Sequence, residues 1–183
     1  MACTLIDLDN QIDCPVSDGG IVESRVAECT DITAVTIEAL TGIITAFTMA
    51  STGLWKKLVY DDDDTAFFNQ EGVRVNNKHT FTQTAFMKFA GVNNAKRLVV
   101  EGLTPCCCLV VVHFLSNGTA VVQGLENLAS LTTWRTAKKK AKVTANVMSD
   151  TAANEDRVEF NFISESRNSA MYTDLTAADL DAL

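Results

Sequence analysis

The chain has 183 residues, a mass of 19.8 kDa, a net charge of −8 and a pI near 4.7. Hydrophobic residues make up 47% of it and charged residues 21%, so a wholly disordered chain is excluded and a domain with its own core is expected. The acidic charge disfavours tight binding to nucleic acid or to anionic lipid, because like charges repel.

The sequence also bears on where the protein folds. Its longest apolar run, Cys106 to Leu115, is too short to span a membrane and is interrupted by His113. The N-terminus MACTLIDLDN has neither the basic start nor the apolar core of a secretory signal. We therefore expect the chain to fold in a reducing cytoplasm, or in a particle assembled there.

Charge divides the chain into three parts. Residues 1–31 carry seven acids and one base, and residues 149–183 carry eight acids and two bases, whereas residues 32–148 have a balance of +4. Together with the pattern of strands, this predicts an acidic N-terminal arm (1–31), a β domain (32–165) and a C-terminal arm (166–183). Two interpretations of the arms stay open: they are solvated termini, or they contact the body of a neighbouring copy.

The first predicted elements are two hairpins. The runs Ile32–Glu38 and Ile43–Met49 alternate threonine with apolar residues and flank a Thr-Gly pair, a typical hairpin pattern. The runs Ala66–Val75 and Lys78–Phe89 flank Asn76-Asn77, and asparagine accepts the positive φ of a tight turn. At ~3.3 Å per residue each arm of this second hairpin would reach roughly 33 Å. A domain of this size covers so long a ribbon poorly, so we expect it to contact another subunit.

The rest of the chain predicts one internal helix, further strands and a short terminal helix. An asparagine cap, helical spacing of apolar residues and a proline predict a helix that begins at Asn93 or Asn94 and ends before Pro105. Asn117-Gly118 joins the apolar run before it, expected to be buried on both faces, to the strand Thr119–Gln123. Segment 126–141 is ambiguous between helix and loop. Alternation predicts strands at Lys142–Met148 and Arg157–Phe162, and a capping box predicts a helix at Thr176–Leu183.

No catalytic, cofactor-binding or metal site is predicted, and the chain is not expected to be an enzyme. Cys107 and His113 would share one face of a strand but lie ~20 Å apart, while Cys108 would point to the opposite face from His113. His79 could approach a cysteine through the fold, but nothing in the sequence places one beside it. None of the six cysteines lies in a C-x-x-C spacing, so they are predicted to be reduced, small, buried side chains. They are Cys3, Cys14, Cys29, Cys106, Cys107 and Cys108.

Two charged clusters have alternative interpretations. Asp61 to Asp64 lack the spacing of a calcium-binding EF-hand loop, which leaves a solvated turn or an acidic lining of a channel. Lys138–Lys140, with Lys142 and Arg135, form a basic cluster. It is a solvated face, a contact for an acidic arm of a neighbour, or a phosphate contact.

These features resemble the tail tube proteins of bacteriophages and the related inner tubes of contractile injection systems. The resemblance covers most of residues 32–165 as an order of elements. It is closest in WKKLVYDDDDTAFFNQEGVRVNNKHTFTQTAFMKF, in the helix GVNNAKRLVVEGL, and in the closing RVEFNFISESRNSAMYTDL. The expected fold is mainly β: a β-sandwich or open barrel with one packed α-helix, a long extended hairpin and an arm at each end. The triple cysteine and the long acidic N-terminal stretch depart from the family's pattern.

The resemblance implies a virion structural protein. Copies of the chain would form sixfold rings that stack into a hollow tube in the virion tail, assembled in the host cytoplasm beside other tail proteins. DNA would pass through the tube without tight binding, past an acidic interior to which Asp61, Asp62, Asp63 and Asp64 are candidates. No cofactor and no membrane are implied. The candidate contacts between subunits lie at the hairpin's distal end: Val73, Arg74, Val75, Asn76, Asn77, Lys78 and Phe81.

Two alternatives remain open. A different virion component, such as a capsid decoration, head–tail joining or tail terminator protein, would share a β core and arms but would not polymerise. A soluble ligand-binding β domain would need an exposed aromatic platform, and the few large aromatics are scattered along the chain: Trp55, Tyr60, Trp134 and Tyr172.

Overall fold

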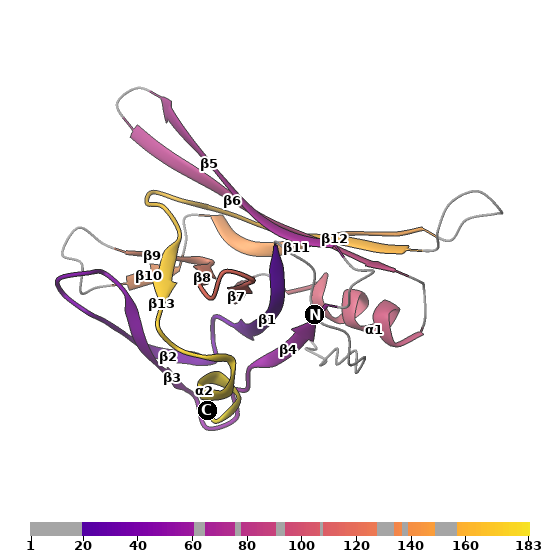
Figure 1. Ribbon diagram of the computed structural model, residues 1–183, viewed down its shortest axis with the longest axis horizontal. Coiled ribbons are helices and arrows are strands. Elements are labelled where there is room, and N and C mark those ends of the chain that lie inside the picture. Colours follow the sequence, from indigo (N-terminus) through magenta and orange to yellow (C-terminus); the bar gives the residue numbers. More distant parts are fainter. Residues whose placement is uncertain are drawn as a thin grey trace.

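The chain folds into two β-sheets packed face to face, with a helix against one end of the core between them (Figure 1). This computed structural model describes residues 20–60, 65–75, 78–90, 94–106, 108–127, 134–136, 139–148 and 157–183. The strands are β1 (Ile21–Glu28), β2 (Ile32–Ile37), β3 (Ile44–Met49), β4 (Lys56–Val59), β5 (Thr65–Val75), β6 (Lys78–Ala90), β7 (Leu109–Leu115), β8 (Ala120–Gln123), β9 (Leu125–Asn127), β10 (Trp134–Thr136), β11 (Lys139–Met148), β12 (Arg157–Ser166) and β13 (Met171–Thr173). The helices are α1 (Asn94–Leu103) and α2 (Ala177–Asp181).

The two sheets differ in shape. The body sheet has the strand order β2-β3-β13-β8-β7-β1-β4, with one parallel pair, β13 with β3. The hairpin sheet has the order β11-β12-β6-β5 and is antiparallel throughout. A single bridge between Ala141 and Leu109 joins β11 to β7 and so connects the sheets. In Figure 1 the hairpin sheet lies across the top of the molecule, and the body sheet lies beneath it.

The core between the sheets is rich in aromatic side chains. Phe89 stacks on Phe160 with ring centroids 5.4 Å apart, and Phe160 meets Phe162 edge to face at 5.6 Å. All three rings are buried, and the buried face of α1 closes the core with Val99, Val100 and Leu103. Replacing one such ring by alanine is expected to cost about 3–5 kcal/mol.

A second core lies on the opposite face of β7. Because side chains alternate along a strand, Leu109 and Val111 face the hairpin sheet while Val110 and Val112 face this second core. Strands β2 and β3 and Leu180 of α2 cover it. The expectation that the apolar run before Asn117 is buried on both faces is therefore confirmed for its β7 portion.

The predicted mainly β fold with one packed internal helix is confirmed, and the local turn signals explain much of it. Gly42 and Gly118 have φ of 73° and 81°, a left-handed conformation that glycine adopts without strain, at the β2–β3 and β7–β8 turns. The helix expected at Asn93 or Asn94 begins at Asn94 and ends before Pro105. The terminal helix has the expected capping box, in which Thr176 and Asp179 exchange hydrogen bonds.

Several elements differ from the sequence-based expectation. Residues 21–28, assigned to the N-terminal arm, form β1, which lies between β4 and β7 in the body sheet. The C-terminal arm is docked on its own domain, because β13 joins the body sheet and α2 buries Leu180. The segment left between helix and loop contains the β9–β10 hairpin in its described part. The run expected to begin a strand at Cys106 enters β7 only at Leu109.

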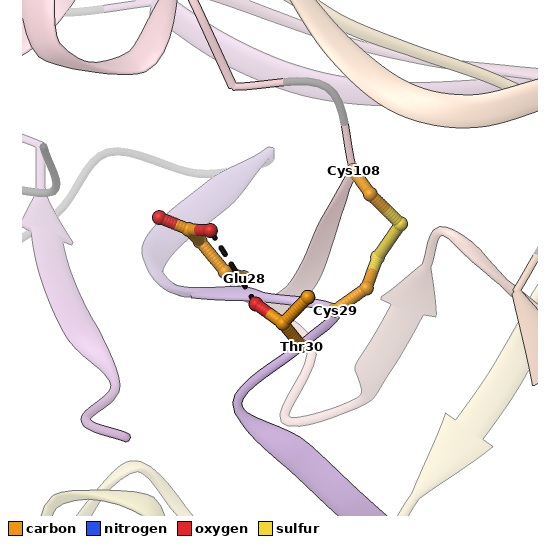
Figure 2. The surroundings of a disulfide bond; sticks show 4 residues. All are labelled: Glu28, Cys29, Thr30 and Cys108. Carbon is orange, nitrogen blue, oxygen red and sulfur yellow. Dashed lines mark hydrogen bonds between the residues drawn. A yellow bond between two sulfur atoms is a disulfide. The ribbon is translucent and has the colours of Figure 1, made fainter. Parts of the chain in front are cut away.

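The prediction that all six thiols are reduced is wrong. Cys29 follows β1 and Cys108 precedes β7, and the two form a disulfide with Cα atoms 5.5 Å apart (Figure 2). The Cys29 amide also donates to the Cys108 carbonyl at 3.1 Å, so the disulfide continues the β1–β7 pairing by one step. Cys106 is disulfide-bonded as well. The sequence offered no sign of this pairing, because the two cysteines are 79 positions apart and become neighbours only when β1 and β7 pair.

Candidate functional site

The hairpin of β5 and β6 leaves the body at a pair of glutamines. Gln70 and Gln83 face each other in the ladder, and the Gln70 Oε1 accepts a hydrogen bond from the Ala170 amide at 2.6 Å. Gln83 is fully buried, where its Nε2 donates to Ser166 and its Oε1 accepts from Ser164, both at 3.1 Å. Residues 71–74, 78 and 79 beyond this pair are all exposed. The distal hairpin, residues 71–82, therefore projects from the domain (Figure 1).

Five of the seven predicted contact residues lie on the described part of this distal hairpin. Val73 is 46% exposed, and Arg74 stands opposite His79 in the ladder. Val75 and Lys78 form the last described ladder pair. The Phe81 ring lies over Gly72, where a Cβ would come within 2.9 Å of the ring. The remaining candidates, Asn76, Asn77 and Asp61 to Asp64, lie outside the described residues.

The tip carries a basic hollow that the sequence did not predict. The hollow has a volume of about 490 Å³, and its described lining residues are Lys78, His79, Thr80 and Arg167. Lys78, His79 and Arg167 are all exposed. Arg167 directly follows Ser166, the last residue of β12. It lies near the tip because Ser166 pairs with Phe81 of β6. His79 and Arg167 were missed because only the strand register brings them together.

The outer face of the hairpin sheet is covered by no described element. Phe67 of β5 stacks on Phe86 of β6 with centroids 5.1 Å apart, and Phe67 is 46% exposed. Cross-strand rows continue this face from β5 through β6 to β12. They are Phe67–Phe86–Asn161, Asn69–Thr84–Ile163 and Glu71–Thr82–Glu165, followed by the pair Lys88–Glu159. The same register places Lys78, opposite Val75, on this face. The face is thus mixed polar and apolar and carries both acids and bases.

A buried polar network centred on His113 joins the two sheets. Gln123 donates from Nε2 to the carbonyls of Gln83 and Phe162, both at 2.9 Å, which turns its Oε1 toward His113 Nε2 at 3.0 Å. That oxygen can only accept, so His113 carries its proton on Nε2. Its Nδ1 then accepts from Ser24 at 2.9 Å, and Ser24 accepts from the Tyr60 hydroxyl at 3.1 Å.

This network explains the one histidine in an apolar strand. Burial lowers the pKa of His113 to about 4, the hydrogen bond with Gln123 opposing that shift in part. The imidazole is therefore neutral near pH 7. Although a serine contacts a histidine here, both side chains are fully buried, so the pair has no path to a substrate in this structure. We interpret the network as the polar link that fixes the sheets in register.

A buried charge anchors the C-terminal helix. Arg25 of β1 is 1% exposed, and its guanidinium donates to both oxygens of Asp181, from Nε at 2.5 Å and from Nη2 at 2.9 Å. It also donates to Glu23 at 3.0 Å. Desolvation lowers the pKa of Arg25, but the hydrogen bonds to the two carboxylates outweigh it, so the pKa of Arg25 is raised. The hydrogen bond from Arg25 in turn lowers the pKa of Asp181. A charge buried this deeply needs such partners.

An open groove lies beside that helix. It has a volume of about 780 Å³ and is bounded by β13, the start of α2 and the turn between β7 and β8. Phe114 and Leu175 contribute apolar surface, Tyr172 is 54% exposed, and Glu23 and Asp174 contribute carboxylates. No group of histidine, cysteine and acidic side chains suited to a metal ion occurs among the described residues. Nor is any helix of the described part both long and apolar enough to cross a membrane.

Comparison with known proteins gives no relative. The chain matches no protein-family model, and neither a characterised protein sequence nor a solved structure shows significant similarity to it. The function is therefore inferred from the geometry above.

Proposed function

We propose that the chain is a virion structural protein whose copies assemble into sixfold rings and stack into the hollow tail tube of a bacteriophage. The observation that carries this proposal is the projecting hairpin of β5 and β6, with its free edge and its uncovered outer face. A monomer gains little from an exposed ribbon of this length, whereas a subunit of a closed assembly can bury it.

The edge of the hairpin sheet supports assembly through strand pairing. β5 has eleven residues and pairs with β6 alone among the described strands. Its outer row of backbone N–H and C=O groups can accept a strand of a neighbouring copy. Repeated around a ring, such pairing would close the four-stranded sheets into one barrel without edges.

The acidic charge of the chain supports passage of DNA. The protein has a net charge of −8, and Asp61 to Asp64 directly precede β5, the edge strand of the hairpin sheet, in the sequence. If these four carboxylates line the tube, they repel phosphate and let a duplex slide without adhering.

The disulfides fit a particle that leaves its host. Disulfides persist in oxidising surroundings and are uncommon in a reducing cytoplasm. A subunit made and assembled in the cytoplasm can complete Cys29–Cys108 after release of the virion. Assembly then takes place in the cytoplasm, and the disulfide forms in the released particle.

Electron microscopy of the purified chain, with sedimentation velocity at several concentrations, tests the proposal. Hollow tubes or stacked rings are the expected result. Only a species of the chain mass, 19.8 kDa, at every concentration would contradict it. Single rings that never stack would favour the alternative of a head–tail joining or tail terminator protein.

A further inference from the structure

We infer that the basic hairpin tip of one copy docks in the acidic groove beside α2 of the next copy. This rests on the proposed function and adds to it the surface that receives the hairpin. Here the basic tip means Lys78, His79 and Arg167, and the acidic groove means the hollow bounded by β13, the start of α2 and the β7–β8 turn.

The basic tip is unusual in an acidic chain. The protein has a net charge of −8, yet the hollow at the tip is lined by Lys78, His79, Thr80 and Arg167, with no carboxylate among its described residues. The three basic side chains are exposed. Val73, 46% exposed on the other strand of the hairpin, adds an apolar contact. Such a surface suits a partner that has carboxylates around an apolar floor.

The groove has those properties. Its apolar floor comes from Ile43, Phe114 and Leu175, and the exposed Tyr172 stands at its side. Glu23 and Asp174 line it. Asp179 and Asp181 of α2 follow its lining residues in the sequence, and the bases whose charges act on these carboxylates are Arg25, which binds Glu23 and Asp181, and Lys57. The negative excess remains after Arg25 has been neutralised by its own two carboxylates.

The tip points away from the groove of its own copy. In Figure 1 the β5–β6 hairpin projects at the top of the molecule, while α2, whose start bounds the groove, lies at the bottom. A contact between two unlike surfaces is heterologous: it closes into a ring where the rotation between copies closes, and otherwise it continues from copy to copy without limit. The second case is the geometry that stacking requires. The groove, about 780 Å³ and open to solvent, leaves room for the side chains of a two-stranded tip.

A charge-exchange experiment on the full chain tests this contact. The tip variant Lys78→Glu/Arg167→Glu makes the tip acidic, and the groove variant Asp174→Lys/Ala178→Lys makes the groove basic; Asp174 and Ala178 are exposed lining residues. Each variant alone should raise the protein concentration needed for half-maximal assembly by at least about tenfold, because like charges then face each other. Mixing the two should restore assembly, since each variant supplies the partner that the other needs.

The controls separate this inference from the proposed function. Lys56→Glu matches the charge change of Lys78→Glu at a site on β4 and should assemble as the wild type does. A wild type that forms no assembly would contradict the proposed function itself. A wild type that assembles, with tip and groove variants that assemble equally well, would overturn only the docking. If the tip variant assembles normally but loses binding to duplex DNA, the basic tip is a phosphate contact and the docking is likewise overturned.

Discussion

The guanidinium of Arg25 and the carboxylate of Asp181 form a two-point contact across 156 positions of sequence. It joins β1, near the start of the described chain, to α2, near its end. The arginine is almost fully buried, while about half of the Asp181 side chain remains exposed. The C-terminal segment is therefore fixed to the body by a charged contact as well as by the buried Leu180.

Removing this contact should destabilise the fold. Asp181→Asn leaves Arg25 with Glu23 as its remaining carboxylate, and we expect the free energy of unfolding to fall by about 1–2 kcal/mol, the partial exposure of Asp181 limiting the loss. Urea unfolding measures it. Asp174→Asn, an exposed acid seven positions earlier, is the control and should change stability by less than about 0.5 kcal/mol. Equal losses in both variants would contradict the prediction.

The same pair predicts a dependence on acid. The hydrogen bond from Arg25 lowers the pKa of Asp181. The ion pair therefore contributes fully to the free energy of unfolding above about pH 4, the pKa of an aspartate in the unfolded chain. This contribution is lost as the pH falls through the lower pKa of Asp181 in the folded protein. Wild type and Asp181→Asn should therefore converge in stability in strong acid. A difference that persists unchanged at low pH would mean that the contact is not ionic.

His113 predicts a separate pH dependence at milder acidity. Its folded-state pKa is about 4 against 6.5 when unfolded, so the unfolded chain binds more protons between those values and stability falls as the pH falls through that window. From pH 7 to pH 5 the loss should be about 2 kcal/mol. The measurement is best made in a His79→Gln background, where His113 is the one histidine left. An imidazole that titrates near 6.5 by NMR would contradict the buried network.

The disulfide between Cys29 and Cys108 should contribute strongly to stability. It closes a segment of 79 positions, and loop-closure entropy predicts a stabilisation of up to about 4.5 kcal/mol, less where the other disulfide already restricts the unfolded chain. The double variant Cys29→Ala/Cys108→Ala leaves neither of these two thiols free. Urea unfolding should show that its free energy of unfolding is lower by that amount. Thiol titration after unfolding without reductant should give fewer than six thiols; six would show that the disulfide is absent.

Local patterns in the sequence predicted the elements that carry their own signals. The turns at Gly42 and Gly118 and the capping box of α2 need only neighbouring residues, and all three occur where expected. β1 was not predicted as a strand because its residues are buried without alternating: Ser24, Arg25, Val26 and Ala27 follow one another in the interior. Their polar groups are satisfied by His113 and Asp181, partners that the sequence does not place nearby.

The candidate site was predicted in part for the same reason. The long hairpin follows from alternation and from Asn76-Asn77, and its exposure follows from its length. The basic tip depends on Arg167, which reaches Lys78 and His79 only through the pairing of β12 with β6. The acidic groove depends on β13 joining β8. A three-residue strand has too few residues to show a period, so no sequence pattern could predict it.

Shortening the hairpin should separate folding from assembly. Replacing Gly72–Phe81 by a two-residue Asn-Gly turn keeps Glu71 and Thr82 as the last ladder pair. It removes exposed residues and the ring of Phe81, which lies over Gly72 on the same hairpin. The Gln70–Gln83 pair and its contacts remain. The change also removes the ladder partner of Ser166, so we expect a loss of about 1–2 kcal/mol with a near-native circular dichroism spectrum.

Assembly should be lost in that shortened chain, because the docking tip and the distal part of the free edge are gone. A control that changes only Asn76-Asn77 to Asn-Gly keeps the length of both strands and should assemble as the wild type does. Sedimentation velocity and electron microscopy compare the three proteins at equal concentration. An unfolded shortened chain would show that the hairpin belongs to the monomer's core. A shortened chain that still builds tubes would move the contact between copies to another surface, and the Lys138 to Lys142 cluster would become the next to test.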